Sequence, residues 1–222
     1  MQKWPFKPLE FELLPEAEMQ QRSLAFCQRI SHRRTVREFS DRPVPRDIIE
    51  NAIRAAGSAP SGANMQPWHF VAVANPEVKM RIRAAAEIEE RALYEHRASE
   101  EWLKALEPLG TDEHKPFLET APWLIAVFLK KFTTDAEGRR HKNYYPAESV
   151  GIACGFLLAA LHWSGLATLT HTPSPMKFLR EVLERPDTER PFILVVTGYP
   201  ADGATVPDIG KEPLESFSTF LV

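Results

Sequence analysis

Two short stretches near the start of the chain hold residues whose types and spacing could do chemistry. Arg33, Arg34 and Arg37 place three guanidinium groups within five residues. A guanidinium donates paired hydrogen bonds to a phosphate, so such a cluster is typical of a phosphate site. About one helix later, residues 59–68 form a Pro/Ser/Gly loop whose backbone amides can approach a ligand closely. Either stretch alone fits a solvated turn, whereas the pair in this order favours a ligand site.

The composition of the 222-residue chain narrows the class of protein. Apolar residues make up 44% of it and the net charge is −3. A chain of this size can bury one hydrophobic core. It has no excess of basic residues, so its charge gives no indication that it binds nucleic acid. Cys27 and Cys154 have no CxxC spacing, which fits a reducing compartment, and the apolar run around Cys154 indicates a buried thiol. We therefore expect a single cytoplasmic domain over residues 1–222.

Neither a targeting segment nor a membrane span is expected. Met1–Glu10 has no apolar core and no cleavage site. The longest apolar run, Val150–Leu161, is shorter than the roughly 18 residues that a membrane span requires.

Motifs of several other chemistries are missing from the sequence. It contains no GxGxxG, GxxxxGK, HExxH or GxSxG pattern. The seven histidines are scattered, so we expect no metal site. A ligand site built from arginines and loop amides needs none of these motifs.

Hydrophobic periodicity and Pro/Gly punctuation predict helices that alternate with strands. The expected helices are 15–31, 45–57, 76–97, 146–164 and 175–184, and the expected strands are 68–74, 123–129, 166–172 and 192–197. The continuously apolar run 123–129 is typical of a strand buried on both faces. Helix 146–164 is apolar almost all round, which places it at the centre of the fold or in an interface. Residues 98–116 indicate a mobile lid and residues 199–222 an extended arm, around an α/β or α+β sandwich.

Most of the chain, from Arg33 to about Pro213, resembles the iodotyrosine deiodinases, the halotyrosine-reducing branch of the nitroreductase superfamily. The segments that carry the resemblance are 33–37, 59–63, 89–90 with Tyr94, Lys115 before 120–122, 143–145, 152–155, 170–173, 198–200 and 204–208. Many nitroreductases share the arginine and Ser-Gly motifs, and the set Glu90, Tyr94 and Lys115 is more specific. The resemblance implies an α+β fold, a nitroreductase-like α-β-α sandwich that binds FMN as a domain-swapped homodimer.

The resemblance also implies where the FMN phosphate is held. Arg33, Arg34 and Arg37 would grip the phosphate and the ring edge, with Thr35 between them. Lys211 would add positive charge near the phosphate. Animal members of the family carry arginine near that place, so lysine keeps the charge but loses the planar fork.

Further cofactor contacts implied by the resemblance come from Ser61 and Gly62, across the subunit interface, and from His171. Thr170 and Thr172 would lie under the flavin as the catalytic residues, with one hydroxyl donating to flavin N5. Taken alone, both threonines are ordinary β-branched residues of a strand.

The substrate contacts follow from the charges of a free amino acid. A zwitterion needs a receptor with both signs of charge, so Glu90 would accept from the α-ammonium and Lys115 would bind the α-carboxylate, which the Tyr94 phenol would also contact. Glu90 and Tyr94 are i, i+4 and share one helix face. Without the resemblance they would be interpreted as a solvated pair. Ala63 would offer its backbone N–H to the substrate phenolate, as an oxyanion hole does. The lid, about 90–116, would close over the substrate.

The implied reaction is FMN-dependent reductive dehalogenation of halotyrosines, which converts iodotyrosine to tyrosine plus iodide. A reductase or NAD(P)H would supply the electrons. The nearest alternative is a general NAD(P)H-dependent nitroreductase or quinone reductase on the same fold. A flavin-destroying relative that makes the lower ligand of cobalamin is disfavoured by a zwitterion receptor. The remaining alternative is a flavin-binding protein without turnover.

Overall fold

The computed structural model describes residues 4–221 and consists of two compact units, Met1–Arg33 and Arg34–Val222. The first unit contains helix α1 (Glu16–Ser31), which begins after Pro15 as the sequence predicts. Within the described part of the chain, α1 buries none of its residues. Residues 1–3 and 222, at the ends of the expected domain and arm, lie outside the described residues.

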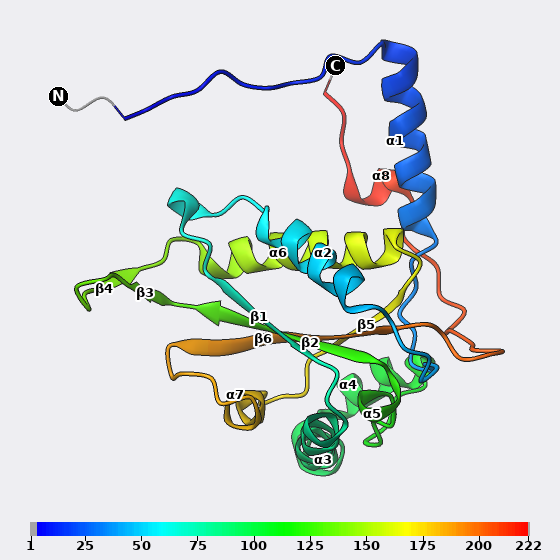
Figure 1. Cartoon of the computed structure of the whole chain (residues 1–222). Helices are drawn as coiled ribbons and strands as arrows, with labels where there is room; N and C mark the ends of the chain where they lie inside the picture. Colours follow the sequence, from blue (N-terminus) through cyan, green and yellow to red (C-terminus); the bar gives the residue numbers. More distant parts are fainter. Residues whose placement is uncertain (1–3, 222) are drawn as a thin grey trace. The chain divides into compact units, whose positions relative to one another are not determined.

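The second unit is built on an antiparallel sheet (Figure 1). Within residues 4–221 its strands are, in the order in which they lie, β1 (Trp68–Val73), β2 (Trp123–Lys130), β6 (Glu189–Gly198) and β5 (Ala167–His171). The predicted strands are confirmed to within three residues at each end. The central strand β2 is buried at its six middle positions, as its continuous apolar run predicts.

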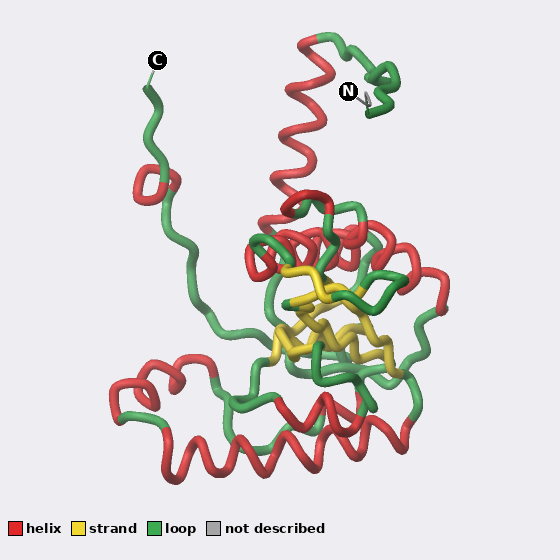
Figure 2. The backbone as a smooth tube through the Cα atoms, turned by 90° about the vertical axis from the view of Figure 1, so that its left-hand side faces the viewer, coloured by secondary structure: helices red, strands yellow, loops and turns green. Residues whose placement is uncertain are grey.

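Helices cover both faces of the sheet, as Figures 1 and 2 show. Helices α2 (Arg46–Gly57) and α6 (Pro146–Trp163) lie on one face. Helices α3 (Pro76–Ala92), α5 (Phe117–Thr120) and α7 (Lys177–Val182) lie on the other. Each layer buries its own apolar cluster against the sheet, which confirms the expected α+β sandwich.

The segment expected to be a lid contains regular structure. After α3 the chain forms a π-helical turn (Leu93–Arg97), then α4 (Glu100–Leu106) and a 3-10 turn (Glu107–Leu109). Ser99 caps α4, because its Oγ accepts a hydrogen bond from Trp102 N at 3.2 Å. The two ends of the segment are buried, at Glu90 and at Lys115. The helical structure within this segment was not predicted from the sequence, and its mobility as a lid stays a prediction.

A small hairpin was not predicted from the sequence. Strands β3 (Phe132–Thr134) and β4 (Arg140–Lys142) pair antiparallel, and all six of their residues are exposed. A strand that buries neither face has no alternation of apolar and polar residues to reveal it.

Helix α6 is longer than the apolar run Val150–Leu161, which by itself is too short to span a membrane. Its 18 residues, with a mean hydropathy of 1.2, are long and apolar enough to cross a membrane by length and composition alone. The core helix of a globular protein passes the same test, and α6 packs on α2, β2 and β5. Cys154 is buried on this helix as predicted, and burial raises the pKa of its thiol to about 11.

From Tyr199 the chain runs as an extended arm, broken by one short helical turn, α8 (Leu214–Phe217) (Figure 2). The arm carries large apolar side chains that remain exposed, among them Phe217 at 70% and Phe220 at 72%. Residues 199–221 are thus extended apart from α8, and their role as an arm stays a prediction.

Candidate functional site

The most specific predicted pair of site residues meets in the structure. Glu90 comes from the last turn of α3 and Lys115 precedes α5. Lys115 Nζ lies 3.0 Å from Glu90 Oε2, with the two side chains 3% and 9% exposed. Charged side chains are almost never buried unless they are paired, so Glu90 is not the solvated surface residue of the alternative interpretation.

Residues of the lid complete the surroundings of this ion pair. Lys115 Nζ also donates to Thr111 Oγ1 at 3.1 Å and to the carbonyl of Asp112. Tyr94 donates its phenol proton to the Thr111 carbonyl at 2.9 Å, and its ring centroid lies 5.7 Å from Lys115 Nζ. Burial raises the pKa of Tyr94, and the negative charge of Glu90 adds to this, so the phenol stays protonated at neutral pH. Glu90, Tyr94 and Lys115 are therefore brought together as predicted.

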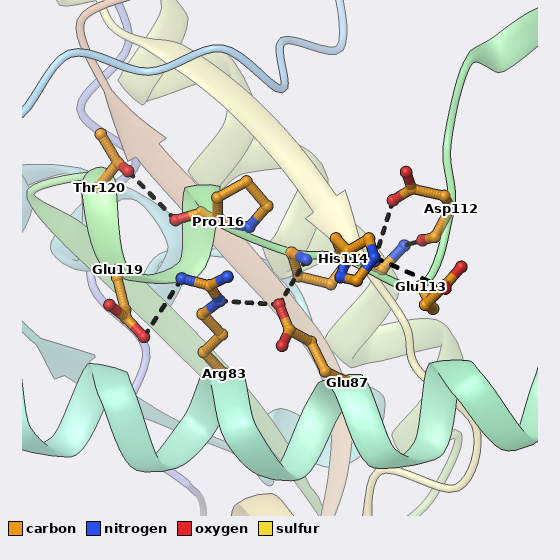
Figure 3. Close-up of polar contacts among 9 residues, drawn as sticks. Arg83, Glu87, Asp112, Glu113, His114, Pro116, Glu119 and Thr120 are labelled. Atoms are coloured by element: carbon orange, nitrogen blue, oxygen red, sulfur yellow. Dashed lines mark hydrogen bonds and ion pairs between the residues drawn. The ribbon is translucent and has the colours of Figure 1, made fainter.

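A charged side chain of α3 also contacts the backbone of Lys115. Glu87 Oε1 accepts from the Lys115 backbone N–H at 2.8 Å and from Arg83 Nε at 2.7 Å. Arg83 also reaches Glu119 at 3.5 Å, so it stands between two carboxylates from different segments (Figure 3). Burial raises the pKa of Glu87, but the hydrogen bonds from Arg83 and from the Lys115 amide outweigh it and leave the pKa lowered.

The two candidate catalytic threonines and the histidine between them lie at the end of β5, where Thr170 and His171 are the last residues of the strand and Thr172 follows it directly. Thr170 and Thr172 are exposed, whereas His171 is buried, with its ring edge-on to Phe117 at 5.6 Å between centroids. Within residues 4–221, His171 Nε2 has no hydrogen-bond partner. Burial, and then the charges of Lys115 and Arg37, lowers the pKa of His171 to about 3. Because side chains alternate along a strand, the His171 ring faces away from Thr170 and could offer a flavin beside the threonines only its backbone.

The arginine cluster lies partly against β5. Thr35 forms a β-bridge with Thr168, and Val36 N donates to the Thr168 carbonyl at 3.2 Å. Arg34 donates to the carbonyl of Pro207 in the arm. Arg37 is half-buried, and burial lowers the pKa of its guanidinium while Tyr94 opposes the shift.

A cavity of about 400 Å³ opens beside Arg37, lined by Thr35, Arg37, Glu38, residues 107–110 and residues 205–207. Lys211 is an exposed residue further along the arm. Arg33 ends the first unit. The parts that Arg33 and Lys211 play in binding stay predictions.

The loop after α2 is tightly built. Gly62 N donates to Ser149 Oγ on α6 at 3.4 Å, and a Cβ at Gly62 would lie 2.6 Å from the Tyr144 carbonyl oxygen. Ser61 Oγ accepts from Gln66 N at 2.9 Å. Ala63 takes a φ of 50°, and Asn64, Gln66 and Tyr145 also have positive φ. Left-handed backbone at non-glycine residues is strained, and such strain collects at ligand sites.

The predicted substrate contacts lie on different faces of the sheet, with Ala63 on one face and the pair of Glu90 and Lys115 on the other. The loop with Ala63 contacts α6, on one face, whereas Glu90 and Lys115 belong to the layer of α3 and α5, on the other (Figure 1). A single chain therefore does not bring Ala63 and Glu90 to one ligand.

Comparison with known proteins places the chain in a family. The model of the nitroreductase family matches residues 30–199. An iodotyrosine deiodinase from Haliscomenobacter hydrossis is 56% identical over 208 residues, which cover 94% of this chain and 92% of that protein. The chain belongs to the iodotyrosine deiodinase branch of the nitroreductase family. The human family member, iodotyrosine deiodinase 1, is 44% identical over 94% of this chain and 72% of its own length.

Solved structures agree with this placement. The crystal structure of an oxidized iodotyrosine deiodinase bound to FMN and 3-iodo-L-tyrosine aligns with a TM-score of 0.74 and 30% identity, over 88% of this chain and 100% of that one. A BluB-like flavoprotein from Clostridium difficile, with a TM-score of 0.68 and 21% identity, shares the fold alone.

Several contacts of the site were not predicted from the sequence. Arg83 and Glu87 belong to a charged helix and have no pattern that separates them from its solvated residues. The i, i+4 spacing of Arg83 and Glu87 and the i, i+3 spacing of Glu87 and Glu90 were the available signals.

Proposed function

We propose that this chain is an FMN-dependent oxidoreductase that reductively dehalogenates halotyrosines, with iodotyrosine converted to tyrosine and iodide. The observation that carries the proposal is the buried ion pair of Glu90 and Lys115, which offers one negative and one positive group to a ligand. Membership of the iodotyrosine deiodinase branch supports it.

The ion pair suits a zwitterion because it can exchange partners. The α-ammonium of the substrate takes Glu90 and the α-carboxylate takes Lys115, so both buried charges stay neutralised. A ligand with only one of these charges leaves a buried charge without a partner, which is costly. The protonated phenol of Tyr94 is available to donate to the carboxylate. The pair therefore selects free amino acids over amines, acids or plain phenols.

The residues around Thr35 fit FMN by the chemistry of their donors. Arg34 and Arg37 would hold the phosphate, with Arg33, Lys211 and the Thr35 hydroxyl beside them. A cavity of about 400 Å³ at Thr35 and Arg37 is of the size of a cofactor site. When bound, FMN supplies the electrons that reduce the carbon–halogen bond.

The other predicted residues orient the reaction. Thr172 Oγ1 or Thr170 Oγ1 would donate a hydrogen bond to flavin N5, and both residues are exposed, Thr170 on β5 and Thr172 directly after it. Ser61 and Gly62 would contact the flavin from the partner subunit. The backbone N–H of Ala63 would hold the phenolate oxygen of the substrate and so favour the anionic ring.

We also propose a homodimer, because a single chain does not bring the substrate contacts together. A second copy would supply Ala63 to the Glu90 side of the first. Helix α6 offers a surface for this contact: Ile152 and Phe156 are 44% and 43% exposed, and a Cβ at Gly151 or Gly155 would meet nothing within 4 Å. The exposed apolar residues of the arm would cross to the second copy.

The test is a titration of the flavin signal of the purified protein with 3-iodotyrosine, tyrosine and 3-iodotyramine, which lacks the carboxylate. Tight quenching by 3-iodotyrosine alone, followed by tyrosine formation after reduction with dithionite, supports the proposal. A bound flavin that is indifferent to all three ligands favours the general nitroreductase or quinone reductase. Turnover with NAD(P)H or with an added reductase then identifies the electron donor, in the cytoplasmic setting that we expect.

A further inference from the structure

Glu87, on helix α3, accepts a hydrogen bond from the backbone of Lys115. Its Oε1 accepts from the Lys115 N–H at 2.8 Å and from Arg83 Nε at 2.7 Å, and Arg83 is held in turn by Glu119 (Figure 3). Glu87 and Glu90 are i, i+3 on α3, so one helix face holds both the backbone and the side chain of Lys115.

We propose that Glu87 is a positioning residue, which fixes the Lys115 backbone so that its ammonium stands opposite Glu90 and is ready for the substrate carboxylate. This inference rests on the proposed function, because it concerns the affinity for the amino-acid head group. A lysine side chain has many rotamers, so its charge is placed only if its backbone is held. The hydrogen bond from the amide to a carboxylate is of the strong, charge-assisted kind.

The fold has other contacts between α3 and the segment that follows Lys115. Lys79 Nζ donates to the carbonyls of Glu119 and Ala121 at 2.7 and 2.8 Å. Ile82 and Ala86 of α3 pack in the same apolar cluster as Phe117 and Leu118 of α5. The loss of Glu87 therefore frees the Lys115 backbone while α3 and α5 stay packed, so its effect is selective for the head group.

The chain offers matched variants for a test on the full-length protein loaded with FMN. Glu87→Ala removes the acceptor, and Glu87→Gln keeps a neutral oxygen that can still accept from the Lys115 N–H. Glu77→Ala removes an exposed carboxylate from the first turn of the same helix and is the control. The readouts are the dissociation constants of 3-iodotyrosine and of FMN, with the thermal midpoint of unfolding.

The expected result is a dissociation constant for 3-iodotyrosine at least about tenfold higher in Glu87→Ala, which corresponds to about 1.4 kcal/mol. FMN affinity stays within twofold, Glu87→Gln recovers most of the loss, and Glu77→Ala behaves as wild type. Equal affinity of wild type and Glu87→Ala overturns the inference, and so does a parallel loss of FMN, because that is a general structural effect.

Two other outcomes can be distinguished from these: a Glu87→Ala protein that does not fold, and a wild-type protein that does not bind 3-iodotyrosine. If Glu87→Ala does not fold, Glu87→Asp keeps the charge but withdraws the oxygen from the Lys115 amide. It is then expected to weaken 3-iodotyrosine binding selectively, and unchanged affinity overturns the inference. If the wild-type protein itself binds FMN but not 3-iodotyrosine, the proposed function fails, and this inference fails with it.

Discussion

Lys115 Nζ lies 3.0 Å from Glu90 Oε2, and the two side chains are only 3% and 9% exposed. The pair joins the last turn of α3 to the segment just before α5. Burying two charges is costly, and the cost is offset only while each has a partner. The pair is therefore stable in two arrangements, closed on itself or opened by a ligand that carries both charges.

We expect Glu90→Gln to weaken the binding of 3-iodotyrosine roughly ten- to a hundredfold, as the loss of a charged hydrogen bond of about 1.5–3 kcal/mol would do. FMN should remain bound, because Glu90 is not among the residues that we expect to contact it. Titration of the flavin signal with 3-iodotyrosine measures the effect. An unchanged affinity would show that the substrate does not use this carboxylate.

Substitutions can tell apart the two exposed threonines, Thr170 on β5 and Thr172 directly after it. We expect Thr172→Ala to lower the rate of dehalogenation at least about tenfold with little change in FMN affinity, since the loss of one positioned hydrogen-bond donor has this order of effect. Thr172→Ser, which keeps the hydroxyl, should recover the rate. If Thr170→Ala shows the larger effect, Thr170 is the donor to flavin N5. Equal losses of rate and of FMN affinity would argue against either role.

Gly62 cannot accept a side chain without movement of its neighbour. In Gly62→Ala the new Cβ would meet the Tyr144 carbonyl oxygen at 2.6 Å, which is backbone and cannot turn aside. We expect a loss of about 1–3 kcal/mol of stability, as for other overpacked sites, and weaker FMN binding. Urea unfolding and the flavin content of the purified protein measure both. An unaltered flavin content would show that the loop around Gly62 does not contribute to FMN binding.

The exposed face of α6 tests the homodimer. A Cβ at Gly155 would meet nothing within 4 Å, so Gly155→Glu is tolerated by a single chain but places a charge in the proposed interface. We expect a folded monomer without bound FMN, seen by analytical ultracentrifugation. Gly57→Glu on α2, another glycine with open space around it, is the control and should stay dimeric. A dimeric Gly155→Glu would place the interface elsewhere.

His171 makes stability depend on pH. Its pKa falls from 6.5 to about 3 on folding, first because of burial. Between these values the unfolded chain binds a proton that the native protein does not, so this residue lowers stability as pH decreases from about 6.5 towards 3, by at most about 1.4 kcal/mol per pH unit. His171→Phe should therefore lose less stability than wild type between pH 7.5 and pH 4.5 in urea unfolding. Parallel losses would show that the histidine titrates normally.

Local patterns in the sequence were sufficient for most of the secondary structure. The apolar run of β2 and the apolar stripe of α2 reflect which faces of these elements are buried. Burial of a face sets the spacing of apolar residues along the chain, so it can be recognised in the sequence. The same reasoning missed β3 and β4, because a hairpin exposed on all its residues has no such period. It also did not predict α4, which lies within residues 98–116.

The sequence by itself determined the family, the arginine and Ser-Gly motifs, and the types of residue that a zwitterion site needs. Only the tertiary structure decided that Glu90 and Lys115 form a buried pair, and that Glu87 accepts a hydrogen bond from the Lys115 backbone N–H. It also decided that Ala63 lies on the face of the sheet away from Glu90. The physical reason is that motifs and periodicity report local backbone preference and burial. Contacts between residues far apart in the chain depend on how the layers pack around the sheet.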